Sequence, residues 1–461
     1  MKDQPNKSKG YKLTPTLIKA AIVSSLGGLL FGFDTAVISG TTSSVANLFK
    51  LSDWSIGFVV SSALIGTILG TLITSKPGDI WGRRDILKIL GGLFLISAVG
   101  CALAWNYWSL TFFRFIGGIG VGGASVLGPI YIAEISPAKV RGRLVLLFQY
   151  NVCLGILLAY FSNALISLFG FDEIHIQWRV MFAAESIPAI LFITMLFSIP
   201  KSPRWLVSVH KYEEARNVLV RVGELNIEKE MEEIKKSLEI KTSHLKVNLF
   251  QKKYLYPIFL GVTVAAFNQL SFVNGFLYYL NDTLNEIGAS FGGKFQPVII
   301  GVANVIAVTI ALFTIDKIGR KTLLLIGSWG SAIPLILAAY IAWTRNLTEL
   351  FPWSLAVFIL FFSFSQGSVI WVYISEIFPN KVRSKGQSLG SFTHWGLAAI
   401  VSQLYPVIVS IPKVGLATPF LIGGAMMIIQ FFIVLFFFIE TKGVPLEHME
   451  SKLRINNTQE N

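Results

Sequence analysis

Long apolar runs recur along almost the whole chain and determine its secondary structure. Each run is long enough to cross the hydrocarbon core of a bilayer as a helix, which takes about 20 residues. A run such as 431–439 is apolar at every position, whereas a strand of a membrane barrel alternates between apolar and polar residues. The pattern predicts an all-α membrane protein with twelve membrane-spanning helices, which begin near Leu17, Ile56, Leu87, Tyr107, Leu144, Arg179, Leu255, Phe295, Leu323, Phe351, Ser388 and Leu416.

The charged residues predict the orientation of these helices. The chain of 461 residues has a net charge of +13, which by itself would fit a nucleic-acid partner. However, 33 of its 39 Lys and Arg residues lie before the first span, after the last, or in alternate loops. This asymmetry is the positive-inside rule, so we expect both termini in the cytoplasm, the lipid bilayer as partner, and no nucleic acid.

Two motifs occur twice and divide the chain into halves. The segment 131–141 (YIAEISPAKVR) reappears at 373–383 (YISEIFPNKVR), and 79–84 (DIWGRR) reappears at 316–321 (DKIGRK). Repetition at nearly one spacing predicts two parallel copies of six helices each. The predicted organisation is a cytoplasmic tail at 1–16, a first half at 17–199, a cytoplasmic helical linker at 200–252, a second half at 253–440 and a cytoplasmic tail at 441–461.

The linker is the only long charged stretch. Within 212–239, acidic and basic residues alternate with apolar residues at helical spacing, which predicts short amphipathic helices. A solvated connection between the halves and a functional latch are both consistent with this pattern.

Three charged residues lie within predicted spans, where each costs roughly 2.5 to 3.5 kcal/mol and therefore needs a partner or a purpose. Asp34 lies in the first span, Arg114 in the fourth and Glu185 in the sixth. An Asp beside an Arg stays ionised, whereas an Asp that leaves its Arg in a low dielectric takes up a proton. We interpret the pair as a proton-loaded switch, and the alternative is a permanent structural salt bridge.

A second set of residues in the spans is polar but uncharged. Amide groups both donate and accept hydrogen bonds, which suits a polyhydroxylated solute, and indole rings offer flat apolar faces. Any single amide could instead form a hydrogen bond between helices. The set comprises Gln149, Asn151, Asn268, Gln269, Asn274, Asn304 and His394, together with Trp371 and Trp395.

Enzyme chemistry finds no support in the sequence. Gly118, Gly120 and Gly123 fit the dinucleotide-binding spacing, but no strand precedes them and they fall within a span, where small residues let helices approach closely. The five histidines have no metal-ligand spacing, and no nucleophile lies near a base. We predict no enzymatic activity, no cofactor and no metal.

Several motifs, taken in order, resemble those of the sugar porter family of the major facilitator superfamily. The resemblance covers residues 21–446 and rests on 32–36 (GFDTA), 82–84 (GRR), 114–118 (RFIGG), 129–134 (PIYIAE), 202–205 (SPRW), 269–271 (QLS), 319–321 (GRK) and 440–443 (ETKG).

The resemblance implies a major facilitator fold and transport of a monosaccharide with a proton by alternating access. It further implies a monomer in the inner membrane of a bacterium. Asp34 matches the acid of proton-coupled members, Arg114 its partner and Glu185 a nearby acid. The positions that match the sugar-binding residues of the family are Gln149, Asn268, Gln269, Asn274, Asn304, Trp371 and His394, beside which Trp395 is a further candidate.

The resemblance also implies a cytoplasmic lattice of charges that closes the inner side of the transporter and opens again in each cycle. The matching residues are Asp79, Gly82, Arg83, Glu134, Arg141 and Arg204 in the first half and Asp316, Arg320, Glu376 and Arg383 in the second.

Six positions depart from the family pattern, two of which are Ile80 at an Arg position and Ser368 at a Pro position. Asn268 stands where the first of two paired glutamines is usual, and Phe272 where a Gly is usual. His394 occupies a Gln or Asn position, and Lys201 a Glu position. The identity of the sugar therefore stays open, as do two alternatives for the function, a passive facilitator and a sugar sensor without transport.

Overall fold

The structure is a computed structural model that describes residues 13–243, 248–289, 292–379, 382–412, 415–442 and 453. Within these residues all regular secondary structure is helical, and twelve helical segments are long and apolar enough to cross a membrane. The prediction of twelve spanning helices is confirmed.

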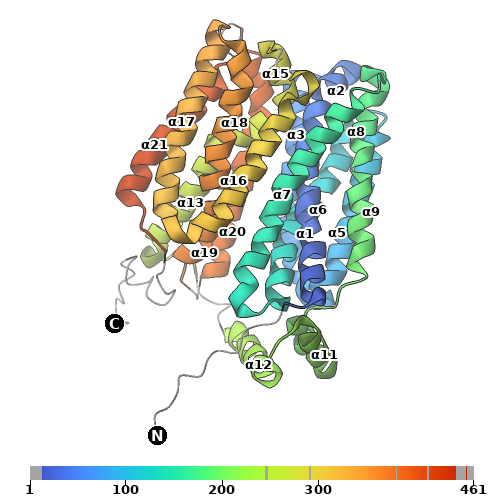
Figure 1. Cartoon of the computed structure of the whole chain (residues 1–461), viewed down its shortest axis with the longest axis vertical. Helices are drawn as coiled ribbons and strands as arrows, with labels where there is room; N and C mark the ends of the chain where they lie inside the picture. The colour runs from blue at the N-terminus through green and yellow to red at the C-terminus, as the bar shows by residue number, and fades with distance from the viewer. Residues whose placement is uncertain are drawn as a thin grey trace.

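Each half contributes six spans (Figure 1). The first half contains α1 (Pro15–Val37), α3 (Asp53–Ile73), α5 (Arg83–Ala102), α6 (Tyr107–Ile135), α7 (Ala138–Ile166) and a sixth span built from α8 (Trp178–Ala184) and α9 (Ser186–Leu196). The second half contains α13 (Leu255–Leu270) with α14 (Val273–Tyr278), α16 (Gln296–Ile318), α17 (Arg320–Thr344), α18 (Phe351–Phe362) with α19 (Ser368–Ile377), α20 (Arg383–Val409) and α21 (Thr418–Phe437).

The halves meet along two pairs of helices. In the first half α1 packs on α7 and α3 packs on α6, and across the interface α3 meets α20 while α7 meets α16. Figure 1 shows α7 and α16 side by side where the green and yellow parts of the chain adjoin. Short helices α2 (Thr42–Phe49) and α15 (Leu280–Ile287) lie at the end opposite the linker, which the charge distribution assigns to the outside.

Four helices begin three to six residues earlier at their cytoplasmic ends than the apolar runs indicate. They start at Arg83, Ala138, Arg320 and Arg383 rather than at Leu87, Leu144, Leu323 and Ser388. Backbone hydrogen bonding continues beyond the hydrocarbon layer, where basic side chains reach the interface, so hydropathy alone places these ends too late.

Glycines let neighbouring helices come into backbone contact. A Cβ atom on Gly118 of α6 would lie 1.9 Å from the Ala63 carbonyl oxygen of α3, and one on Gly32 of α1 would lie 1.9 Å from the Val152 carbonyl oxygen of α7. The interpretation of Gly118 as a helix-packing residue is confirmed.

The linker forms three helices. A further short helix, α4 (Ser75–Trp81), lies in the earlier loop between the second and third spans. Linker helices α10 (Pro203–Ser208), α11 (Tyr212–Val222) and α12 (Ile227–Ser243) share one apolar core with the first half, where Trp205 and Leu219 join Leu17 and Tyr131. Thr14 also donates a 2.8 Å hydrogen bond to the Arg221 carbonyl. The predicted amphipathic helices are confirmed, and this packing joins them to the first half.

Candidate functional site

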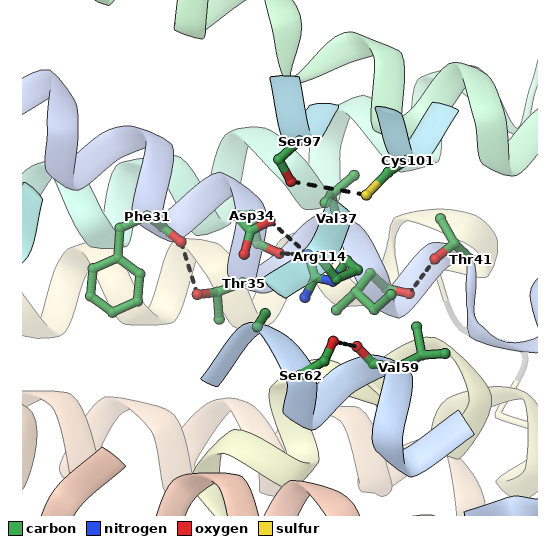
Figure 2. A network of polar contacts seen from close by, with 12 residues as sticks. Phe31, Asp34, Thr35, Val37, Thr41, Val59, Ser62, Ser97, Cys101 and Arg114 are labelled. Carbon is green, nitrogen blue, oxygen red and sulfur yellow. Dashed lines mark hydrogen bonds and ion pairs between the residues drawn. The ribbon is translucent and has the colours of Figure 1, made fainter. Parts of the chain in front are cut away.

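A buried ion pair links the first and fourth spans. Arg114 Nη1 lies 2.6 Å from Asp34 Oδ1 and 3.4 Å from the Asp34 carbonyl oxygen. Only 4% of Asp34 and 1% of Arg114 is exposed. Figure 2 shows the two side chains pointing toward each other between α1 and α6. The sequence predicted this pair, and the structure brings it together.

The guanidinium of Arg114 keeps unused hydrogen-bonding capacity. Within the described residues, Nε and Nη2 of Arg114 are buried without a hydrogen-bond partner, and so is Oε1 of Glu185. Glu185 is 1% exposed and close enough to interact electrostatically with both members of the pair. A site with one carboxylate engaged and a second carboxyl nearby can exchange partners when one of them gains a proton.

Gly117 makes room for Ser97 beside this pair. A Cβ atom on Gly117 would lie 2.3 Å from Ser97 Oγ and 3.8 Å from Asp34 Oδ1. Ser97 in turn contacts the Cys101 thiol at 3.9 Å (Figure 2). Both cysteines are free and buried.

A cavity of about 560 Å³ lies between the halves. Its walls include Ser75, Ile315, Ser384 and Gln387, which lie at the cytoplasmic ends of α4, α16 and α20. The cavity therefore leads toward the cytoplasm. Three predicted binding residues line it: Gln149, Trp371 and Trp395.

Four other predicted binding residues form a hydrogen-bonded cluster behind the cavity wall. Gln269 Nε2 lies 2.9 Å from Asn268 Oδ1 and 3.2 Å from His394 Nε2, and Asn274 Nδ2 donates to Gln269 Oε1 at 2.8 Å. The His394 ring packs against Trp371 and Trp395, with centroid distances of 5.0 Å and 4.8 Å. The two indoles thus line the cavity and pack on the His394 side of the cluster.

Phe272 shapes this cluster. It adopts a left-handed backbone conformation (φ 63°) at the break between α13 and α14, a conformation that Gly adopts more readily. The break turns Asn274 back toward Gln269. The remaining predicted residues lie apart: Asn304 is buried in α16 with Oδ1 unpartnered within the described residues, and Asn151 donates to Ser25 Oγ at 2.8 Å.

Three of the predicted cytoplasmic charges of the first half, Asp79, Arg83 and Glu134, form one cluster. Arg83 Nη2 lies 2.6 Å from Asp79 Oδ1 and 3.0 Å from Glu134 Oε1, and Ser202 Oγ donates to Glu134 Oε2 at 2.6 Å. Gly82 has φ 93°, which lets the chain turn between α4 and α5. Arg141 donates to the Ser136 carbonyl at 3.3 Å, and Arg204 follows Ser202 at the start of α10.

The second half repeats this arrangement. Arg320 binds Glu376 through Nε at 3.1 Å and Nη2 at 2.9 Å, and Gly319 has φ 102°. Thr441 Oγ1 donates to Glu376 Oε2 at 2.6 Å. Arg383 donates to the Phe378 carbonyl at 3.3 Å, and the side chain of Asp316 lies outside the described residues.

Sequence reasoning missed a set of contacts that close the outer side. Ser61 Oγ donates to Gln403 Oε1 at 2.7 Å, and Gln403 Nε2 donates to the Trp54 carbonyl at 2.8 Å. Tyr160 OH donates to the Leu277 carbonyl at 3.0 Å. All three contacts join the two halves, so the molecule is closed outside and open inside. The only sequence signal was a lone amide, Gln403, in the eleventh span.

Comparisons with known proteins agree with this architecture. The sequence model of the family described as "Sugar (and other) transporter" matches residues 20–453. The chain is 36% identical to the D-xylose-proton symporter of Escherichia coli (strain K12) over 98% of this chain and 97% of that protein. It is 35% identical to the arabinose-proton symporter of Bacillus subtilis (strain 168), with 94% of each chain covered.

A solved structure has the same overall shape. The inward open conformation of the xylose transporter XylE from E. coli superimposes with a TM-score of 0.84 at 35% identity, and the match covers 95% of this chain and 99% of that one. This similarity agrees with the cavity that leads to the cytoplasm and the contacts that close the outer side.

Proposed function

Because this chain belongs to the sugar transporter family of the major facilitator superfamily, we propose that it moves a monosaccharide across the membrane together with a proton, by alternating access. Asp34 carries the proton, and Arg114 holds Asp34 ionised when no proton is bound. The 2.6 Å contact between these two buried side chains is the observation that carries the proposal.

The inward-open structure corresponds to the state after release. In this state the ion pair is intact and the cavity opens to the cytoplasm. The inward-open conformation therefore forms without a bound proton or sugar. When the site next faces outward, a proton on Asp34 cancels its attraction for Arg114. The freed guanidinium then turns to Glu185, whose Oε1 is free of hydrogen bonds within the described residues, and sugar binding follows.

The sugar binds between the indoles and the amides. Trp371 and Gln149 already line the cavity, and the hydrogen bonds that Gln269 makes with Asn268, Asn274 and His394 exchange for bonds to sugar hydroxyls. Uncharged amides suit a neutral polyol because they supply donors and acceptors without a net charge to desolvate. The cargo is an aldopentose, the class to which the sugars in the names of the two relatives belong.

The cytoplasmic clusters hold the helix ends of each half together. Arg83 with Glu134, and Arg320 with Glu376, join helices within one half. Ion pairs near water are individually weak, so these ends can rearrange as the inner side opens and closes. The protein acts as a monomer in the inner membrane of a bacterium with both termini in the cytoplasm, and it catalyses no chemical conversion.

A proton-flux measurement tests this proposal. Proteoliposomes with purified protein are suspended in a weakly buffered medium, and D-xylose or L-arabinose is added outside. Symport predicts that the medium becomes more alkaline as sugar enters, and that a protonophore abolishes accumulation. Sugar equilibration without a pH change would identify a passive facilitator instead, and sugar binding without flux would identify a sensor.

A further inference from the structure

A second carboxyl group lies at the closed outer side of the molecule, far along the chain from the Asp34 site. Asp282 belongs to α15, which follows the seventh span, and it lines one pocket with the hydroxyls of Thr42 and Ser43. Those hydroxyls belong to α2 of the first half. The pocket therefore lies between the two halves and changes each time the outer side opens.

Asp282 lines a polar pocket of about 740 Å³ between the halves. The pocket walls combine Thr42 and Ser43 of α2 with Tyr405 of α20 and Trp343 at the end of α17. With the outer side closed, Asp282 is half-buried in this pocket, whereas opening the outer side would separate α2 from α15 and return the carboxyl to water.

The charged groups around Asp282 do not neutralise it. Glu286 lies one turn further along α15, and Asp53 at the start of α3 adds a third acid to the pocket wall. Arg345 is the one Lys or Arg among the pocket-lining residues. It binds Glu286, through the carbonyl at 2.6 Å and Oε1 at 3.4 Å.

The other titratable groups nearby are phenols. Tyr405 OH lies 2.9 Å from Thr283 Oγ1, and Tyr279 OH donates to the Ser402 carbonyl at 3.2 Å. Helix α18, which also packs on α15, has no titratable side chain, and α16 has none at this end. Lys294, just before α16, donates to the Ser167 carbonyl at 2.7 Å. Asp282 thus faces neutral hydroxyls and one acid, Asp53, across the interface, and a second acid, Glu286, on its own helix.

We propose that Asp282 is a second proton-binding site, which takes up a proton from the external medium as the outer side closes, so that external acid favours the inward-facing state. The inference rests on the proposed alternating access, but not on Asp34. Thr42 and Ser43 can serve either form of the carboxyl, because a hydroxyl donates to a carboxylate and accepts from a carboxylic acid.

Burial in the closed pocket raises the pKa of Asp282 from 3.8 to about 6, with a contribution from Glu286, while the hydrogen bonds from Thr42 and Ser43 lower it. A carboxyl whose pKa is raised in one state favours that state when it is protonated. The closed outer side is therefore most favoured below pH 4, and this contribution is lost as the pH rises through about 6. Between pH 7.5 and pH 5, the ratio of closed to open molecules should rise about 10-fold.

The test measures the outer opening directly. Spin labels are placed at Asn47 of α2 and Asn285 of α15, both exposed, in a chain whose two buried cysteines are replaced by Ala. Pulsed electron resonance then gives the populations of short and long distances in lipid nanodiscs. With Asp282 in place, the ratio of short to long distances between the two labels should rise about 10-fold when the pH falls from 7.5 to 5.

Variants separate this site from the transport site. D282N should remove the shift, while E286Q should retain it. T42V should move the midpoint of the pH-dependent shift to higher pH, because the hydroxyl that it removes no longer stabilises the carboxylate. The substitution changes the side-chain volume little. D34N should retain the shift even if it abolishes coupled transport. A native protein with no shift, or a shift that persists in D282N, would overturn the proposal while leaving proton coupling through Asp34 intact.

Discussion

Gln403 in α20 bridges the two halves on the outer side. It accepts a hydrogen bond from Ser61 of α3 at 2.7 Å and donates one to the Trp54 carbonyl at 2.8 Å. Ser61 is buried and Gln403 partly so. Since one carboxamide makes both contacts, replacing Gln403 removes both and should destabilise the closed outer side.

Replacing Gln403 should favour outward-facing molecules. Q403A removes two hydrogen bonds that exist only when the outer side is closed, each worth about 1 kcal/mol. We expect the ratio of open to closed molecules to rise roughly 10-fold or more, measured with the Asn47 and Asn285 label pair. S125A alters a hydroxyl whose one hydrogen bond within the described part of the chain lies in its own helix, at 2.8 Å, and serves as control. Equal distance distributions in Q403A and the parent would contradict this role.

The amide cluster should determine sugar affinity. Gln269 contacts Asn268, Asn274 and His394, so Q269L removes the group at its centre and leaves its partners unsatisfied. We expect the dissociation constant for the transported sugar to rise about 10-fold to 100-fold, since each buried hydrogen bond that is lost costs about 1 to 3 kcal/mol. Isothermal titration calorimetry on purified protein measures this change.

Gln366 provides a matched control for that experiment. It is another fully buried Gln in the second half, but within the described residues neither of its amide atoms has a hydrogen-bond partner. Q366L should therefore leave sugar affinity unchanged and should not lower thermal stability. An equal loss of affinity in Q269L and Q366L would mean that any change in the helix core weakens binding, and that Gln269 has no specific part.

Glu440 should stabilise the cytoplasmic end of the second half. Its carboxylate accepts hydrogen bonds from the backbone N–H groups of Arg320 at 2.9 Å and Lys321 at 3.1 Å, at the start of α17. A carboxylate there satisfies free N–H groups and interacts well with the helix dipole. E440A should cost about 1 to 2 kcal/mol of stability, and E440Q less. A melting temperature equal to that of the parent in both variants would exclude this role.

Hydropathy and charge were sufficient to predict the twelve spans and the two halves, because burial in lipid demands long apolar helices whatever their neighbours are. The Asp34 and Arg114 pair was also predictable, since unpaired charge in a membrane is costly. The repeated motifs led to two equivalent clusters, Arg83 with Glu134 and Arg320 with Glu376.

Contacts that depend on the relative position of the halves could not be predicted in this way. Ser61 and Gln403 are 342 positions apart, and nothing in either apolar run indicates that they meet. The same holds for Asp282 and the hydroxyls of α2, because an acid in a short helix between two spans does not change the hydropathy pattern that predicts the spans. Which amides line the cavity depends on how the two halves are placed relative to each other, and the pattern of residues within one helix does not determine that placement.

The central claim is that Asp34 couples the sugar to the proton. The most direct measurement compares D34N with the parent in proteoliposomes, by sugar accumulation driven by a proton gradient and by sugar exchange at equilibrium. The account predicts that D34N loses accumulation but still exchanges sugar, because the binding site and the moving halves remain. Accumulation by D34N against a sugar gradient to the level reached by the parent would contradict it.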